Sequence, residues 1–313
     1  MSENSTPPME PLSVGNVVSA GLRIYRDHFM SYFRISLRAT LWSFLPIVFA
    51  LLCIPLVFLS GDYTILFVLI LILIVPVLFI YCAAKYFVNS ALISRLVFGV
   101  LTNQLETVSS ARQMVNPQMW NIWKALFAVG IILFVFNLIL TLAQQLIFSL
   151  LAYILASLNL ELMLPLISLL LSVVVLGLYI WLYSRLFIPE VSLAVETNIN
   201  TSQGISRSWE LTKGSVFRIQ LIVFITFLVT IPMYIVATIP ILASFASIVF
   251  TAANSPAAAL QQFAPIILIT LILFFVATVA ITPFWQVIKG VIYYDLRSRR
   301  EGMGLELRKR EII

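Results

Sequence analysis

GISRSWELTKGSVFRIQL, residues 204–221, is the stretch that decides the fold, because the chain writes its pattern three times. Residues 21–37, GLRIYRDHFMSYFRISL, align with it without a gap from its second residue, and the two copies share two arginines, a phenylalanine, an isoleucine and a leucine. A weaker copy, ARQMVNPQMWNIWKALF at 111–127, holds the two basic positions with Arg112 and Lys124. Each copy joins a short amphipathic segment to a long apolar run. A recurring unit of this kind predicts three structural repeats.

The composition predicts a membrane protein. Of the 313 residues, 61% are hydrophobic and 10% are charged, and the mean hydropathy is +1.06. A soluble domain carries about 25% charged residues, so this excess of apolar side chains belongs in lipid. The first 38 residues are polar and contain prolines and arginines, and we therefore expect no cleavable signal peptide. Cys53 and Cys82 lie in apolar runs, where we expect buried thiols rather than a disulfide or a metal site.

Six apolar runs are long enough to cross the hydrocarbon core of a bilayer, which is about 30 Å thick. The expected crossings are 39–59, 63–84, 125–143, 162–182, 216–237 and 263–284. Two apolar stretches, 125–158 and 219–250, are too long for one upright crossing. In the first we expect the crossing to end near Ala143 and an outer-leaflet segment to follow, with a tilted helix as the alternative. Residues 251–262, TAANSPAAALQQ, predict a charge-free loop.

Short amphipathic helices are expected ahead of each pair of crossings. The first begins at Val14, carries apolar residues at three- and four-residue steps as far as Phe33, and is broken at Asp27-His28. Such a helix lies in the headgroup plane of a bilayer. The second spans 106–115, and the third lies within the stretch quoted first.

Several helix ends are also predicted. Asn116 precedes a proline, which is typical of an N-cap followed by Pro at the first helical position, and Pro117 would then open the third crossing. Thr201 or Ser202 is expected to cap the third short helix at its N-terminus. Gly214 is expected to end that helix, because glycine adopts the left-handed backbone conformation found just beyond many helices.

The domain organisation follows from these elements as a single all-α integral membrane domain. The chain divides into a disordered tail (1–12), a six-helix membrane domain (13–296) with repeat units at roughly 13–100, 105–190 and 200–296, and a charged tail (297–313). Residues 85–95 are expected to continue the second crossing as a partly polar helix. From Lys289 onward the sequence predicts a basic amphipathic helix followed by the charged end.

Orientation is predicted by the distribution of lysine and arginine. The segment before the first crossing, the connection between the second and third crossings, and the connection between the fourth and fifth hold 4 each, and the segment from Lys289 to the C-terminus holds 7, which accounts for all 19. The positive-inside rule then predicts both termini in the cytoplasm. The net charge of +6 is thereby explained by topology, and no nucleic-acid partner is expected.

Residues for catalysis are few. The single histidine, His28, lies at a helix break, and the carboxylates Glu190, Glu196 and Glu210 lie among arginines, where we expect a solvated face. The sequence contains no phosphate-binding glycine loop and no zinc-protease motif. We therefore predict no catalytic, cofactor-binding or metal-binding residues and no cofactor.

The expected crossings contain no ionisable residue, whereas transport proteins commonly carry one at mid-membrane. Lys85, Arg185 and Lys289 lie at the cytoplasmic ends of crossings, where we expect them to reach water. Uncharged polar residues within the membrane indicate either helix-to-helix hydrogen bonds or a substrate path; they are Asn137, Gln144, Gln145, Thr230 and Thr282. Prolines in nearly every crossing are the feature most typical of transporters.

The repeated basic positions are candidate lipid-headgroup contacts. In each copy the first basic residue lies on the short helix and the second at the cytoplasmic start of a crossing, where an anionic lipid attracts each by about 1 kcal/mol. The residues are Arg23 and Arg34, Arg112 and Lys124, and Arg207 and Arg218. The alternative is that they only satisfy the positive-inside rule.

Three segments resemble a known family: PLSVGNVVSAGLRIYRDHF (11–29), SWELTKGSVFRI (208–219) and YYDLRSRREGMGLE (293–306). They look like the membrane-domain family named after glycerophosphoryl diester phosphodiesterases, bacterial integral membrane proteins mostly of unknown function, and the resemblance covers nearly the whole chain. In the members that gave the family its name, a separate soluble barrel domain performs hydrolysis. The resemblance therefore implies a bacterial inner (cytoplasmic) membrane location and no enzyme activity for this chain, and no catalytic residue is carried over.

The sequence leaves three functions open. The first is a non-enzymatic membrane protein that organises lipids or binds partner proteins. The second is a transporter or channel for a small or lipid-like substrate, and the third is an intramembrane hydrolase. The expected partners are membrane lipids, including anionic phospholipid, and a membrane-protein partner or a second copy of the chain.

Overall fold

The computed structural model describes residues 13–59 and 61–302, and over these residues the chain is all-helical. The helices are α1 (Val14–Asp27), α2 (Phe29–Leu59), α3 (Thr64–Leu101), α4 (Val108–Val115), α5 (Met119–Ser157), α6 (Leu164–Arg185), α7 (Pro189–Val195), α8 (Thr201–Thr212), α9 (Val216–Asn254) and α10 (Pro256–Glu301). Six are long and apolar enough to cross a membrane. The prediction of an all-α chain with six such helices is confirmed.

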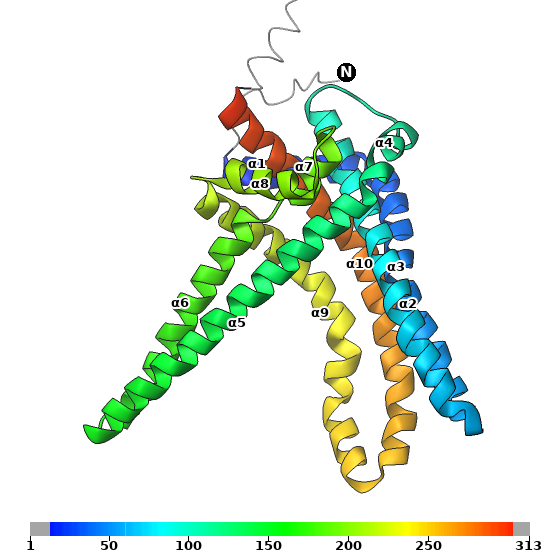
Figure 1. Cartoon of the computed structure of the whole chain (residues 1–313), viewed down its shortest axis with the longest axis vertical. Helices are drawn as coiled ribbons and strands as arrows, with labels where there is room; N and C mark the ends of the chain where they lie inside the picture. Colours follow the sequence, from blue (N-terminus) through cyan, green and yellow to red (C-terminus); the bar gives the residue numbers. More distant parts are fainter. Residues whose placement is uncertain (1–12, 60, 303–313) are drawn as a thin grey trace, which may run out of the picture.

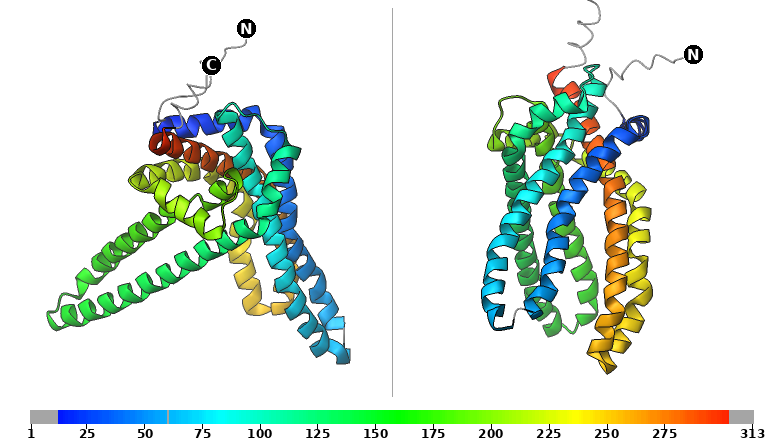
Figure 2. Two further views of the ribbon diagram at one scale, coloured as in Figure 1. Left: turned by 45° about the horizontal axis from the view of Figure 1, so that its top comes forward. Right: turned by 90° about the vertical axis from the view of Figure 1, so that its right-hand side faces the viewer.

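The long helices form three hairpins, α2–α3, α5–α6 and α9–α10, which extend from one end of the molecule (Figure 1). The short helices α1, α4, α7 and α8 gather at that end together with the adjoining turns of the long helices, and we call this assembly the cap. The α5–α6 hairpin diverges from the other two as it leaves the cap, and a second view shows the same divergence (Figure 2). The result is a compact cap that carries three separated legs.

Side-chain caps define where the short helices begin. Ser13 accepts a hydrogen bond from the Asn16 backbone at 3.2 Å to open α1, and Thr107 opens α4 in the same way through Ser110, also at 3.2 Å. In α8 the cap is Asn200, which forms a reciprocal capping box with Gln203. The prediction of Thr201 or Ser202 was therefore wrong by one or two positions. Asparagine caps as well as serine, and the box adds a second hydrogen bond.

Two further predicted helix ends can be compared with the structure. Gly214 has a φ of +79° and lies directly after Lys213, the C-cap of α8, so this predicted stop is confirmed. Asn116 is not an N-cap: it ends α4 in right-handed helical conformation and enters a 3-10 turn, Asn116–Gln118. The turn links α4 to α5, which begins two residues later than Pro117. The predicted break at Asp27-His28 is confirmed, because α1 ends at Asp27 and α2 begins at Phe29.

No helix end lies at Ala143, near which the crossing was expected to end. Helix α5 runs without interruption for 39 residues, which is about 60 Å at 1.5 Å per residue. The neighbouring Gln144 lies within the helix, and its side chain donates a hydrogen bond to Ser172 of α6 at 3.0 Å. Figure 1 shows α5 beside α6 and inclined to α9 and α10; where α5 leaves the bilayer stays a prediction.

The predicted loop at 251–262 is wrong as well. Helix α9 continues to Asn254 and α10 begins at Pro256, so Ser255 alone separates them. Ser255 accepts a hydrogen bond from the Ala258 backbone at 3.4 Å, and proline is suited to the first turn of a helix. Alanine-rich sequence beside these residues favours helix over loop. The predicted continuation of the second crossing through 85–95 is confirmed within α3.

The hydrophobic core lies in the cap. Its largest fully buried side chains include Tyr293, Leu92, Ile93, Ile188 and Ile288. Residue Gly290 of α10 lets that helix approach α3, because an added Cβ would lie 2.9 Å from Val97. Toward the hairpin ends, large apolar side chains are exposed, for example Leu162 at 94%. Packing within the chain therefore holds the cap together, and the hairpins present apolar surface to the bilayer.

Candidate functional site

A buried ion pair lies where the hairpins meet the cap. Glu190, in the first turn of α7, pairs with Lys289 of α10, 99 residues away in the chain. Their side chains are 3% and 17% exposed. The Lys289 ammonium also lies 4.8 Å from the centre of the Phe187 ring. The second carboxylate oxygen of Glu190, Oε2, is buried and has no hydrogen-bond partner among the described residues.

Aromatic residues from other helices surround this pair. The ring of Tyr183 of α6 lies 5.5 Å from that of Phe187, measured between ring centres, and the Tyr86 hydroxyl of α3 lies 3.3 Å from Thr282 of α10. Phe187 packs against Trp285 with ring centres 6.5 Å apart. Residues from α3, α6, α7 and α10 thus converge on one point, which the tertiary fold alone brings together.

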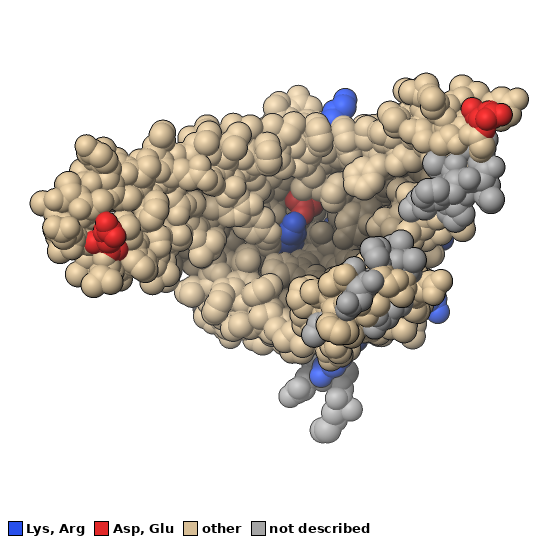
Figure 3. Space-filling model, turned by 90° about the horizontal axis from the view of Figure 1, so that it is seen from below, with Lys and Arg blue, Asp and Glu red and all other residues tan. Residues whose placement is uncertain are grey.

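Viewed from the hairpin ends, the molecule is hollowed between its three legs (Figure 3). A basic and an acidic side chain lie together in the floor of this hollow, and the surrounding surface is otherwise made of uncharged residues (Figure 3). Lys289 follows the apolar run of α10, and Glu190 follows α6 after a short connection.

The structure corrects the predicted environment of several charged residues. Glu190 and Glu196 were predicted on a solvated face, but Glu190 is buried and Glu196 is in an ion pair within the cap. Lys289 and Arg185 were predicted to reach water. Instead Lys289 pairs with Glu190, and Arg185 is buried with its guanidinium 4.1 Å from the centre of the Trp209 ring. The reason is that residues 189–195 fold as α7 and pack into the core.

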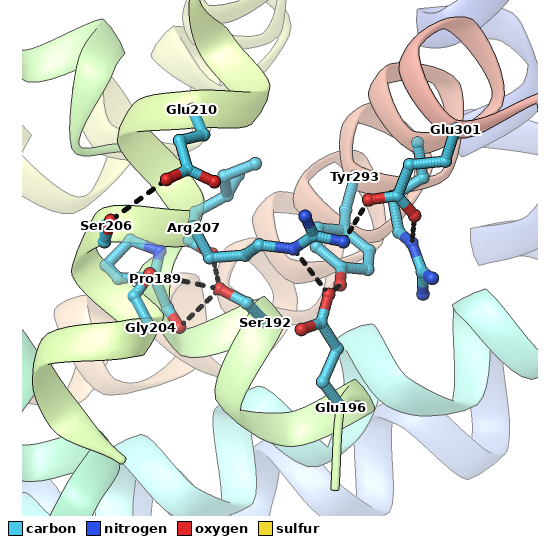
Figure 4. Close-up of polar contacts among 11 residues, drawn as sticks. Pro189, Ser192, Glu196, Gly204, Ser206, Arg207, Glu210, Tyr293 and Glu301 are labelled. Atoms are coloured by element: carbon cyan, nitrogen blue, oxygen red, sulfur yellow. Dashed lines mark hydrogen bonds and ion pairs between the residues drawn. The ribbon is translucent and has the colours of Figure 1, made fainter. Parts of the chain in front are cut away.

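A second polar cluster ties α8 to α7 and α10. Arg207 donates to Glu196 at 2.8 Å and also pairs with Glu301, as Figure 4 shows. The Tyr293 hydroxyl donates to Glu196 at 2.5 Å, and Arg297 pairs with Glu301 at 2.8 Å. Burial lowers the pKa of Arg207, but the two carboxylates outweigh it and leave that pKa raised. Arg207 is therefore always charged, and its ion pairs with Glu196 and Glu301 connect α8 to the end of α7 and to α10.

Other arginines of the cap are likewise engaged. Arg95 of α3 contacts both carboxylate oxygens of Glu106, at 2.9 and 2.8 Å, and donates to the Ala194 carbonyl at 2.8 Å. A two-point contact of this kind fixes the relative orientation of the groups. Arg218 of α9 pairs with Asp295 of α10 at 3.0 Å.

The six predicted headgroup residues fall into two groups. Arg207 and Arg218 are paired with carboxylates inside the cap. The remaining four lie on α1, α2, α4 and α5; Arg23, Arg34 and Lys124 are exposed, and Arg112 is partly buried. In each pair the first residue lies on a short helix and the second near the start of the following long helix. Contact with lipid headgroups stays a prediction.

Within residues 13–59 and 61–302, no group of three or more His, Cys, Asp or Glu side chains is arranged to hold a metal ion. Cys53 and Cys82 are buried free thiols, as predicted. Two of the uncharged polar residues singled out in the sequence, Gln144 and Thr282, make contacts between helices. No protein-family model, curated protein or solved structure matches the chain.

Proposed function

We propose that this polytopic membrane protein is non-enzymatic and organises lipids by holding their acyl chains between its three hairpins. The observation that carries the proposal is the hollow between the hairpins, floored by charged side chains (Figure 3). Apolar side chains are exposed along α5, α6 and α9. Lipid tails are as apolar as these side chains, so a gap between helices within a bilayer is filled by lipid rather than closed by a hydrophobic force.

The proposed orientation has both termini and the cap on the cytoplasmic side of a bacterial inner membrane. The support is the confinement of lysine and arginine to the cap-side segments of the sequence. We also propose that the three hairpins descend from one repeated unit, a short helix followed by two long ones. The order α1–α2–α3, α4–α5–α6 and α8–α9–α10 supports it, with α7 as an addition. Membership of the phosphodiesterase membrane-domain family remains part of this proposal.

A transporter of a lipid-like substrate is the second candidate, and the Glu190–Lys289 pair favours it. Ionisable groups close to the membrane interior commonly mark a substrate path. Both candidates require lipid in the hollow, but transport also requires that lipid leave on the other side.

Reconstitution separates the two candidates. The full chain is placed in vesicles that contain a fluorescent phospholipid in both leaflets, and a membrane-impermeant reductant bleaches the outer leaflet. For a lipid organiser we expect the bleached fraction to equal that of protein-free vesicles, while lipid stays bound through purification. Bleaching beyond that fraction, in proportion to the protein added, would establish lipid translocation and favour the transporter.

A further inference from the structure

We propose that Glu190 and Lys289 together bind the headgroup of a phospholipid that carries a primary ammonium as well as a phosphate, the class of phosphatidylethanolamine. Its acyl chains lie in the hollow between the hairpins. The inference rests on the proposed function, because it assigns the headgroup chemistry of the lipid that the hollow holds. It goes beyond the six basic residues considered from the sequence, since neither Glu190 nor Lys289 is among them.

The unused acceptor of Glu190 is the first argument. One carboxylate oxygen accepts a hydrogen bond from Lys289, and Oε2 is buried without a partner in the part of the chain that the structure describes. A buried charged acceptor that lacks a donor is unfavourable and calls for an explanation. An ammonium group supplies N–H donors and positive charge at once, and the headgroup amine of a lipid is such a group.

The unused donors of Lys289 are the second argument. Its ammonium carries three N–H groups, of which one is used by Glu190. The aromatic ring of Phe187 covers one side of the ammonium at 4.8 Å. A lipid phosphate could accept the remaining N–H groups, in the way that lysine binds phosphate in many proteins.

Charge balance selects the lipid class. The pair is neutral as a whole, so a headgroup with one positive and one negative charge leaves no net charge buried. Phosphatidylcholine has the same charges, but its quaternary ammonium has no N–H group to donate to Glu190. Phosphatidylglycerol has no cation and would place its phosphate beside a carboxylate. Phosphatidylethanolamine alone among these three satisfies both residues.

The position of the pair is the third argument. It lies where the apolar hairpins enter the cap, and the floor of the hollow carries charge (Figure 3). The aromatic side chains beside it, Tyr183, Phe187 and Trp285, are of the kind found at the level of lipid headgroups. A lipid that enters sideways between the hairpins therefore brings its headgroup to the pair and its chains to the apolar walls.

The test uses the full chain purified in mild detergent and incubated with equal amounts of phosphatidylethanolamine, phosphatidylcholine and phosphatidylglycerol. The lipids that remain bound are counted by native mass spectrometry. We expect phosphatidylethanolamine to be enriched over both others. In the Glu190→Gln variant we expect the ratio of bound phosphatidylethanolamine to phosphatidylglycerol to fall about tenfold, which corresponds to about 1.4 kcal/mol. An ion pair with only a structural role would not change this ratio.

Two further variants keep the test decisive. Glu210→Gln removes an exposed carboxylate of α8 that contacts Ser206 and should retain the wild-type ratio. If Glu190→Gln does not fold, the double variant Glu190→Gln/Lys289→Gln, which buries no charge, should bind lipid without preference for a headgroup. Retained phosphatidylethanolamine preference in either Glu190 variant would overturn the inference. Lipid bound to the wild type without preference would overturn it too but leave the proposed function, whereas no bound lipid would overturn both.

Discussion

The Lys289 ammonium and the Glu190 carboxylate form an ion pair between α10 and α7 that is nearly withdrawn from solvent. A charge that is withdrawn from water destabilises the fold unless an opposite charge lies beside it. Each residue of the pair therefore offsets the cost of burying the other. The pair also joins segments 99 residues apart. It therefore links the last long helix to the centre of the cap.

Removal of one partner should be costly. Glu190→Ala leaves Lys289, whose side chain is only 17% exposed, without its counter-charge, and we expect a loss of about 3 kcal/mol in the free energy of unfolding. The measurement is the unfolding midpoint of the detergent-purified chain in denaturant. Replacement of both residues by apolar ones, Glu190→Leu with Lys289→Met, should restore most of the loss. A double variant no more stable than Glu190→Ala would contradict the idea that the unpaired charge is the cause.

The ion pairs of Arg207 with Glu196 and Glu301 should hold α8 in place. Arg207→Ala removes its hydrogen bonds to Glu196 and Glu301, and we expect faster amide hydrogen exchange in α8 and a loss of about 1–3 kcal/mol in stability. Arg26→Ala is the matched control, since the Arg26–Asp27 pair is exposed, with side chains at 79% and 49%. Exchange in α8 that is unchanged by Arg207→Ala would show that apolar packing alone fixes this helix.

The proposed topology can be tested by thiol labelling in intact cells. In a background without Cys53 and Cys82, single cysteines at Asp62 and Glu161, at the ends of the α2–α3 and α5–α6 hairpins, should react with an impermeant reagent. A cysteine at Ser202 on α8 should react only after the cells are opened. Labelling of Ser202 in intact cells would reverse the proposed orientation.

The proposed absence of enzyme activity is tested directly with a glycerophosphodiester substrate. We expect the purified chain to release no glycerol phosphate, with or without divalent cations, because the carboxylates Glu190 and Glu196 are held in ion pairs with basic side chains. Residues Glu190 and Glu196 are the carboxylates to substitute if turnover is seen. Metal-dependent turnover that a single substitution in this chain abolishes would contradict the proposal.

Much of the fold could be predicted from local sequence. Apolar runs determine the long helices, because each run must satisfy its backbone within the membrane, and Gly214 marks the end of α8. The continuity of α5 to Ser157 was not predicted, because the stretch 125–158 was divided by the length of one upright crossing. That length does not limit a helix, and Gln144 lies within α5, where it donates a hydrogen bond to Ser172 of α6.

The candidate site could not be predicted from local sequence either, because it depends on packing between distant segments of the chain. Glu190 follows a proline and stands in the otherwise apolar run LFIPEVSLAV, residues 186–195, which is the one local sign of burial. Its partner Lys289 lies on α10, and only the packing of α7 against that helix brings them together. Reasoning from charge counts treated both residues as solvated, because it contained no information on this packing.

The central claim is that lipid occupies the hollow between the three hairpins. Single-particle cryo-electron microscopy of the full chain in nanodiscs made with phosphatidylethanolamine tests it most directly. We expect the α5–α6 hairpin to stay apart from α9–α10 and elongated, chain-shaped density to fill the space, with headgroup density beside Glu190 and Lys289. A map in which α5–α6 packs along α9–α10, with no space for lipid between them, would contradict the claim.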